Sequence, residues 1–235
     1  MRTLGLIGGM SWESTVPYYQ HINRRIAEEL SGFHSARILL HSVNFHDIEA
    51  LQREDRWDEA GDLLAGVASR LEDGGAECIV LCTNTMHRVA DRIEESVTVP
   101  LLHIADATGE VVRQAGHECV GLLGTRFTME QSFYRSRIQT RFGLRVDVPS
   151  SDDREIVHRV IYEELVHGRV EETSRDSFRR IVSDLVSRGC ESVILGCTEI
   201  GLLLRPEDAA IPLYDTTRIH AEAAARFALK GTWSH

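Results

Sequence analysis

The feature that most constrains the fold of this chain is an internal repeat. The segment Leu4–Gly8 (LGLIG) resembles Val120–Gly124 (VGLLG). Further along, Gly75–Thr83 (GAECIVLCT) resembles Gly189–Cys197 (GCESVILGC), at nearly the same offset in both halves. Glycine-ended strands recur in any α/β sheet, so the first match alone carries little weight. The second match shares Gly, Glu and several apolar positions in register, which favours duplication of one structural unit.

Short β-rich runs alternate with longer helical patterns along the whole chain. Regular alternation of this kind predicts parallel sheets with crossover helices, and therefore an α/β fold. The expected strands are Arg2–Ile7, Ala36–Val43, Cys78–Cys82, Leu101–Ile104 and Cys119–Leu123, and the expected helices are Pro17–Leu30, Trp57–Asp73, Met86–Glu95 and Thr108–Ala115.

In the repeat register, Thr83 of the first half corresponds to Cys197 of the second. Both residues follow the carboxyl end of a predicted strand, where open α/β sheets bind ligands. A thiol can exchange a proton near neutral pH if a helix N-terminus lowers its pKa, and we expect a helix after Cys197 with Thr198 as its cap. The alternative is that Cys197 is a small buried core residue. Polar donors follow the other strand ends, namely Asn84, Thr85 and Thr125.

Two such groups on facing halves suit inversion at an α-carbon, where one group removes a proton and the other returns one to the opposite face. The chain has 235 residues and a net charge of -10, which argues against nucleic acid or anionic membranes as partners. It has no apolar run of about 20 residues and no layout typical of a secretory signal, so we expect a cytoplasmic protein. Its odd number of cysteines, five, favours reduced thiols, although Cys78, Cys82 and His87 leave a zinc site as a remote alternative.

The segments GLIGGMSWEST, LCTNTMH and LGCTEIG resemble the aspartate/glutamate racemase superfamily, in its aspartate racemase branch. The resemblance covers essentially the whole chain and is closest to the enterobacterial group specific for L-aspartate and L-glutamate. It implies two doubly wound parallel-sheet domains related by pseudo-twofold symmetry, with the active site in the cleft between them. The expected domains are 1–102, completed by 207–235, and 103–206. The resemblance also implies a homodimer, no pyridoxal phosphate or metal, and one catalytic cysteine in each half.

The chain departs from this family at two places. The first catalytic segment usually reads Cys-Asn-Thr, but here it reads Thr83-Asn84-Thr85, with Cys82 one position upstream and therefore pointing elsewhere. A threonine hydroxyl is too weak an acid to be a resting base, although it can relay a proton. Cys197 is then the only candidate thiolate. Glutamate racemases carry Asp-Ser and His where this chain has Met10-Ser11 and Glu199, which favours the aspartate racemase branch.

By resemblance, the segments around Gln52–Arg53 and Glu164–His167 meet the distal carboxylate of the substrate, where only His167 of the second segment could supply charge. A solvated helix face is an equal alternative for Arg53 and His167. His87 reads as a residue that orders the loop rather than as a catalytic acid. The candidate substrate-binding residues are Met10, Ser11, Gln52, Asn84, Thr85, Thr125, His167 and Thr198, and the candidate catalytic residues are Thr83 and Cys197.

We therefore expect a cofactor-independent racemase of aspartate or glutamate. Because only Cys197 can begin as a base, and because the second-half cysteine faces the L α-proton by resemblance, the L enantiomer should be favoured. Two alternatives are a one-cysteine decarboxylase or isomerase of the same superfamily and a non-catalytic amino-acid-binding protein. A nucleotide-binding Rossmann enzyme is disfavoured because Gly5-Leu-Ile-Gly8-Gly9 lacks the Gly-x-Gly-x-x-Gly spacing.

Overall fold

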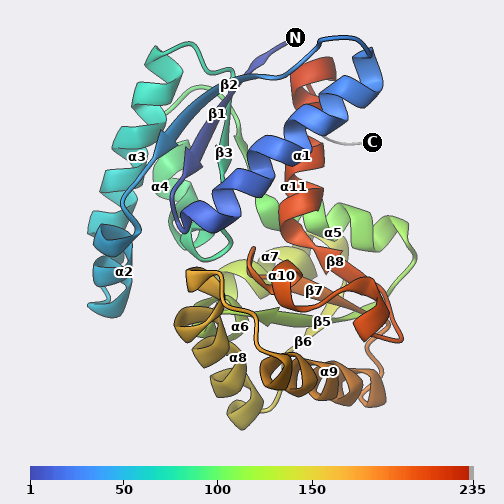
Figure 1. Ribbon diagram of the computed structural model, residues 1–235. Helices are drawn as coiled ribbons and strands as arrows, with labels where there is room; N and C mark the ends of the chain where they lie inside the picture. Colours follow the sequence, from blue (N-terminus) through green and yellow to red (C-terminus); the bar gives the residue numbers. More distant parts are fainter. Residues whose placement is uncertain (233–235) are drawn as a thin grey trace. The chain divides into compact units, whose positions relative to one another are not determined.

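The computed structural model describes residues 1–232, which form two compact α/β units (Figure 1). The first unit contains Met1–Ala107 and the chain from His220 onward, and the second contains Thr108–Ile219. Each unit is built on a parallel sheet of four strands, in the order β2-β1-β3-β4 in the first unit and β6-β5-β7-β8 in the second. The two orders are the same once the strands are numbered from the start of each unit.

The elements of the first half run as follows: β1 Thr3–Gly8, α1 Trp12–Leu30, β2 Arg37–Ser42, α2 Phe45–Arg53, α3 Trp57–Asp73, β3 Cys78–Leu81, the 3₁₀ helix η1 Thr85–Val89, α4 Ala90–Glu94, β4 Leu101–Leu102 and α5 Ile104–Gln114. Those of the second half are β5 Cys119–Gly124, α6 Arg126–Glu130, α7 Ser132–Phe142, β6 Arg145–Asp147, α8 Ser151–Glu163, η2 Leu165–His167, α9 Glu172–Ser187, β7 Ser192–Gly196, α10 Ile200–Leu203, η3 Pro206–Asp208, β8 Leu213–Asp215 and α11 Thr216–Lys230.

The repeat seen in the sequence is reproduced in the strand register. Gly5 of β1 pairs with Ile79 of β3, and Gly121 of β5 pairs with Val193 of β7. Both glycines allow a helix to approach the sheet. A Cβ at Gly5 would lie 3.2 Å from the Cβ of Leu71 in α3, and a Cβ at Gly121 would lie 2.8 Å from a methyl carbon of Leu185 in α9. The two halves are therefore equivalent residue by residue at their central strands.

The repeated glutamate of the two matching segments has the same structural role in each unit. The carboxylate of Glu77 accepts a hydrogen bond from the backbone N–H of Thr3 at 2.8 Å, and that of Glu191 accepts one from the N–H of Glu118 at 2.6 Å. In both units this bond joins the turn before the third strand, β3 or β7, to the beginning of the first strand, β1 or β5. Shared architecture thus explains why this acidic position recurs in the repeat.

Helices cover both faces of each sheet, so each unit is doubly wound as expected. In Figure 1, α3 and α1 lie on opposite sides of the first sheet. In the second unit, α8 and α9 pack one face, while α5 and α7 meet through Gly109 and the ring of Phe142. Burial of each large apolar side chain in these layers contributes about 1.5–3 kcal/mol. The largest fully buried side chains include Tyr18, Tyr134, Phe178 and Phe227.

Several expected boundaries differ from those of the structure. Helix α1 begins at Trp12 rather than Pro17, because the carbonyl of Ser11 accepts hydrogen bonds from the hydroxyls of Ser14 and Thr15 and so anchors an earlier start. The return to the first unit begins at His220 rather than at residue 207, because β8 pairs with β7 and belongs to the second sheet. The chain passes from the first unit to the second after Ala107, inside α5, rather than after residue 102.

Candidate active site

Buried polar residues follow the carboxyl ends of the two central strands of the first sheet. Met10 and Ser11 come after β1, and the Thr83–Thr85 segment comes after β3. These strands are parallel neighbours, so both segments lie at the same edge of the sheet. All of them are buried, as is Gln52 of α2. The amide of Gln52 donates to the sulfur of Met86 at 2.9 Å, which brings α2 against the start of η1.

The loop between β1 and α1 needs glycine. Gly9 has a φ of +91°, and a Cβ there would lie 2.2 Å from the carbonyl oxygen of Val43. Its backbone N–H donates to the hydroxyl of Thr15 at 2.8 Å. The loop that carries Met10 and Ser11 is thereby held close to both β2 and α1, which fixes the backbone at this candidate substrate-binding segment.

His87 fixes the backbone that carries Thr83. The N–H of Ile104 donates to Nε2 of His87 at 3.2 Å, so Nε2 is the unprotonated nitrogen of the ring. Nδ1 must then carry the proton, and it lies 2.7 Å from the carbonyl oxygen of Thr83. A neutral imidazole with one defined tautomer therefore links the Thr83 loop to the start of α5. This supports the interpretation of His87 as a loop-ordering residue.

A second histidine extends this uncharged polar layer. His220 of α11 lies between the hydroxyl of Tyr18, 2.8 Å from Nδ1, and the carbonyl of Leu102, 2.8 Å from Nε2. Burial lowers the pKa of His220 to about 4, and the ring is therefore neutral at physiological pH. Its ring centroid lies 5.9 Å from that of His87, and the His103 centroid lies 4.4 Å from His87. Neutral rings thus support the Thr83 loop.

The equivalent position in the second unit, Cys197, has a different partner. Its thiol donates to Oε2 of Glu199 at 3.0 Å, and the hydroxyl of Thr198 donates to the same oxygen at 2.8 Å. All three residues are buried. Sequence reasoning did not include Glu199 among the site residues. The signal that could have found it is a carboxylate two positions after the thiol, within one turn of the strand end.

The pKa of Cys197 differs from the expectation. Helix α10 begins only at Ile200, has four residues, and is preceded by Glu199 rather than capped by Thr198. Burial and the Glu199 carboxylate raise the pKa of the Cys197 thiol well above its usual value. The backbone N–H groups of Glu199 and Ile200 lower it, but by less. The expected thiolate, stabilised by a helix, is therefore wrong for the resting protein: Cys197 is a protonated thiol that donates to a carboxylate.

The other predicted residues take varied positions. Thr125 caps α6, and its hydroxyl accepts the N–H of Thr128 at 3.3 Å. His167 is exposed at the end of η2, which packs against α10. Arg53 is exposed and paired with Glu49 on its own helix at 2.9 Å, as the solvated alternative predicts.

The remote zinc alternative has no support in the described residues. The thiols of Cys78 and Cys82 donate to backbone carbonyls, at 3.6 and 3.7 Å. Burial raises the pKa of Cys78 to about 12 and raises that of Cys82 further. Both ring nitrogens of His87 are engaged with the backbone, at Thr83 and Ile104. These residues therefore serve strand packing and loop order.

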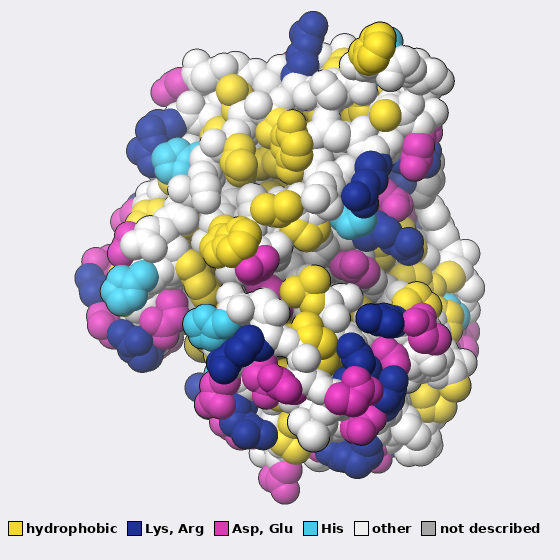
Figure 2. All heavy atoms as spheres, in the orientation of Figure 1, with side chains coloured by type: hydrophobic (Ala, Val, Ile, Leu, Met, Phe, Trp, Pro, Cys, Tyr) yellow, Lys and Arg dark blue, Asp and Glu magenta, His cyan; other side chains and the backbone are white. Residues whose placement is uncertain are grey.

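The surface carries mixed charge. On the face drawn in Figure 2, arginine and lysine side chains are intermingled with aspartate and glutamate side chains rather than gathered in one patch. Exposed ion pairs, such as those between Arg56 and Glu59 and between Arg92 and Asp62, also place opposite charges side by side. Within residues 1–232, none of the helices combines the length and apolar character needed to cross a membrane.

Comparisons with known proteins agree with the fold. In sequence, residues 7–224 match the Asp/Glu/Hydantoin racemase family. The broad specificity amino-acid racemase RacX of Bacillus subtilis is 22% identical over 173 residues, 71% of each chain. A glutamate racemase of Pseudomonas putida is 28% identical over 62% of this chain and 56% of its own. Such glutamate racemases are thus matched over little more than half their length.

Solved structures extend this agreement to the whole chain. A Yersinia pestis protein provisionally assigned as an Asp/Glu racemase superposes with a TM-score of 0.92 at 54% identity, over 98% of this chain and 100% of its own. PH1733 of Pyrococcus horikoshii, an aspartate racemase homologue, gives a TM-score of 0.83 at 34% identity over the same shares. The chain belongs to the Asp/Glu/Hydantoin racemase family.

Proposed function

We propose that the chain is an amino-acid racemase that acts on aspartate or glutamate without a cofactor, with Cys197 as the base and Thr83 as the group on the opposite face of the α-carbon. The observation that carries the proposal is the equivalence of these two positions. The two central strand pairs share one register: Ile7 pairs with Leu81 and Leu123 with Leu195, and Thr83 and Cys197 each follow two residues after the second member of these pairs. Family membership supplies the reaction class, and the repeat supplies the pair of residues.

The first step is removal of the α-proton by the sulfur of Cys197. In the resting protein this sulfur is protonated, so its proton must leave before it can act as a base. Oε2 of Glu199, 3.0 Å from the sulfur, is the acceptor placed to take that proton. The positively charged ammonium group of an amino-acid substrate would also offset the carboxylate charge that opposes thiolate formation. Glu199 thereby links substrate binding to activation of the thiol.

The second step returns a proton to the opposite face of the planar intermediate. The hydroxyl of Thr83 donates its proton to carbon while it accepts another from water, so no alkoxide is left behind. Cys197 keeps the proton it removed, which restores the resting thiol, and the proton held by Glu199 neutralises the hydroxide that the water leaves. The carboxylate of the substrate would be bound by the polar groups that follow the strands, among them Ser11, Asn84, Thr85, Thr125 and Thr198.

Recognition of the substrate's side chain is assigned to two segments, one with Gln52 and one with His167. Gln52 is buried and donates to Met86, which follows the Thr83–Thr85 segment, so its amide is fixed beside the catalytic loop. An amide can donate to a distal carboxylate without imposing a charge. His167, on η2 beside α10, is the second candidate and could supply charge when protonated. Met10 lines the first loop as a buried apolar contact.

The test is exchange of the α-proton for deuterium. A panel of L- and D-amino acids, with aspartate and glutamate included, would be incubated in deuterated water with a chelator and without pyridoxal phosphate. Exchange at the α-carbon is followed by proton NMR, and inversion is followed by chiral chromatography. We expect exchange and inversion with the acidic amino acids, faster from the L form. Release of carbon dioxide from malonates without exchange would replace this proposal by the decarboxylase alternative, and binding without exchange would replace it by the binding protein.

A further inference from the structure

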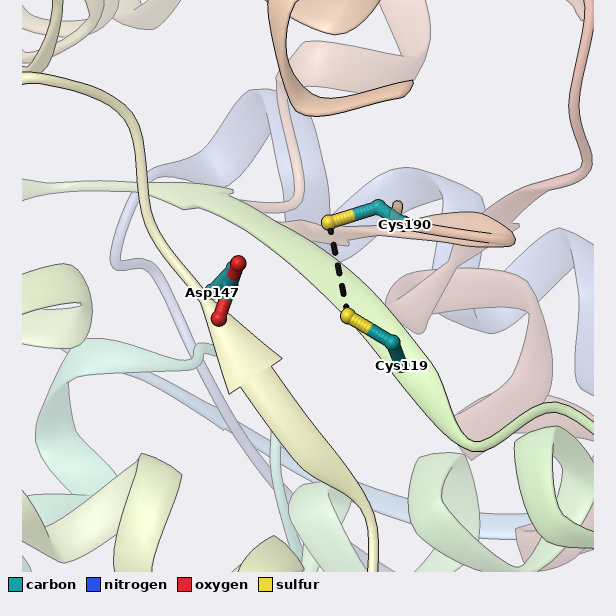
Figure 3. A group of neighbouring side chains, drawn as sticks. All are labelled: Cys119, Asp147 and Cys190. Carbon is teal, nitrogen blue, oxygen red and sulfur yellow. Dashed lines mark hydrogen bonds between the residues drawn. The ribbon is translucent and has the colours of Figure 1, made fainter. Parts of the chain in front are cut away.

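A pair of thiols lies at the other end of the second sheet from Cys197. Cys119 is the first residue of β5, and Cys190 stands just before β7. Their sulfur atoms are 3.7 Å apart, with the thiol of Cys119 directed at Cys190 (Figure 3). Asp147, the last residue of β6, lies beside the pair, with a carboxylate oxygen within 4.8 Å of both sulfurs. The racemase reaction uses none of these side chains.

The two thiols have different environments. The guanidinium Nε of Arg145 donates to the sulfur of Cys119 at 3.1 Å, and a cation in that position favours the thiolate. Cys190 has no such donor on its sulfur among the contacts of the described residues, and burial, followed by Cys119 itself, raises its pKa to about 12. The cationic donor therefore assigns Cys119 the role of the attacking sulfur, and Cys190 that of the second thiol.

Cys119 and Cys190 are buried, at 7% and 3% exposed, but the Arg145 side chain that contacts the Cys119 sulfur is 58% exposed. A small oxidant needs only a displacement of this guanidinium to reach the sulfur. A metal ion is a poorer occupant, because Arg145 and Arg188 pair with the Asp147 carboxylate at 3.6 and 3.4 Å and so place positive charge at the third ligand.

We propose that Cys119 and Cys190 form a reversible disulfide, with a peroxide as the oxidant. The Cys119 thiolate attacks one oxygen of the peroxide, breaks the O–O bond and becomes a sulfenic acid, while the other oxygen leaves as hydroxide. The Cys190 thiol then attacks the Cys119 sulfur and displaces its oxygen as water. The two thiols are oxidised by two electrons, and the peroxide is reduced to two equivalents of water. A dithiol reductant reverses the reaction by exchange.

The geometry favours this second step over further oxidation of Cys119. The sulfurs must close from 3.7 Å to roughly 2.05 Å, a shift that side-chain rotation and small strand movements can supply. The bond would join residues 71 apart in sequence, across two strands already paired in one sheet. A link of that length restricts the unfolded chain, so oxidation should raise the midpoint of thermal unfolding by at least about 5 °C.

The experiment treats the full-length protein, freed of metals by a chelator, with one to a few equivalents of hydrogen peroxide. Free thiols are then blocked with iodoacetamide, and non-reduced peptides are analysed by mass spectrometry. We expect a peptide pair linked through Cys119 and Cys190, which disappears with dithiothreitol. Cys78 and Cys82, buried without a cationic donor, serve as internal controls and should take no oxygen. Absence of the linked pair, with Cys119 carried to sulfinic or sulfonic acid, would overturn the proposal.

Single variants assign the two roles. In Cys190→Ser the sulfenic acid on Cys119 should accumulate and be trapped by dimedone, whereas Cys119→Ser should give no adduct on Cys190. The opposite pattern would contradict the assignment. Arg145→Gln keeps both thiols, and so tests the proposal if a cysteine variant folds poorly. It should slow disulfide formation about tenfold at neutral pH, since it removes the donor that favours the thiolate. An unchanged rate in Arg145→Gln would show that Cys119 needs no such activation.

Discussion

The loops that follow β3 and β7 occupy the same place in two similar sheets, yet they are held in different ways. The Thr83 loop is held by neutral imidazoles, through His87 and the layer that includes His220. The Cys197 loop is held by a carboxylate, because both Cys197 and Thr198 donate to Glu199. One loop therefore has no ionisable group at its reactive position, and the other pairs its thiol with a charge that opposes ionisation.

This difference indicates how a duplicated scaffold can lose symmetry in its chemistry without losing it in its fold. Strand order and register depend on apolar residues and glycines, which the two halves share. In the proposed mechanism, proton transfer depends on one or two side chains in each loop, which the two halves do not share. If Cys197 alone can start the reaction, the L and D substrates should react at different initial rates. Substitution of single residues in the two loops tests this difference.

The largest effect is expected for Cys197→Ser. A serine hydroxyl is too weak an acid to provide the base, so α-deuteration of L-aspartate or L-glutamate should fall by about 10²–10⁴-fold. Exchange is measured by NMR, and folding is checked by circular dichroism. Cys190→Ser is the matched control, since it changes a buried thiol at the start of the same strand, and it should keep its activity. Substantial exchange in Cys197→Ser would remove Cys197 from the mechanism.

The second largest effect is expected for Thr83→Cys, which makes the two reactive positions alike. A second thiol can start the reaction from the D enantiomer, whereas Thr83 would have to lose a proton at a cost of several pKa units, each about 1.4 kcal/mol. The initial rate from the D substrate should rise about 100-fold relative to the rate from the L substrate. Thr83→Ala is the control and should move the ratio the other way. Equal L and D rates in the unmodified protein would show that Thr83 does not limit the reaction.

The fold could be predicted from sequence because it depends on repeated, regular features. The alternation of strands and helices predicted the parallel sheets, and the match between Gly75–Thr83 and Gly189–Cys197 predicted the equivalence of Thr83 with Cys197. The helix start at Trp12 and the role of Glu199 could not be predicted in the same way. Both depend on the direction of a side chain in an irregular loop, which periodicity does not encode. The prediction of a lowered pKa for Cys197 was wrong for this reason: a helix dipole was expected beside the thiol, and a carboxylate was found.

A third prediction concerns Glu199→Gln, which removes the charge beside Cys197. In the resting protein burial and the Glu199 carboxylate raise the pKa of Cys197, so loss of the carboxylate charge should lower that pKa. The pH profile for alkylation of Cys197 by iodoacetamide would then move to lower pH. Racemisation should fall at the same time, because the acceptor of the thiol proton is gone. Glu207→Gln, an exposed carboxylate in η3, is the control. An unchanged pH profile of alkylation would show that Glu199 does not influence the ionisation of Cys197.

The smallest effect is expected for His87→Phe. This variant changes only the way in which the Thr83 loop is held. This variant keeps a ring but removes both the bond to the Thr83 carbonyl and the acceptor for the Ile104 N–H. Cys197 can still remove the α-proton of the L substrate and return deuterium to the same face, whereas a displaced Thr83 serves the opposite face poorly. The ratio of inversion to α-deuteration should therefore fall about tenfold, while exchange from the L substrate changes little. A variant that is merely less stable would lose both activities together. His103→Phe is the matched control, since its ring lies beside His87 and its Nδ1 accepts the N–H of Ala105, and it should leave the ratio unchanged. A parallel loss of exchange and inversion in His87→Phe would make His87 a packing residue rather than the group that positions Thr83.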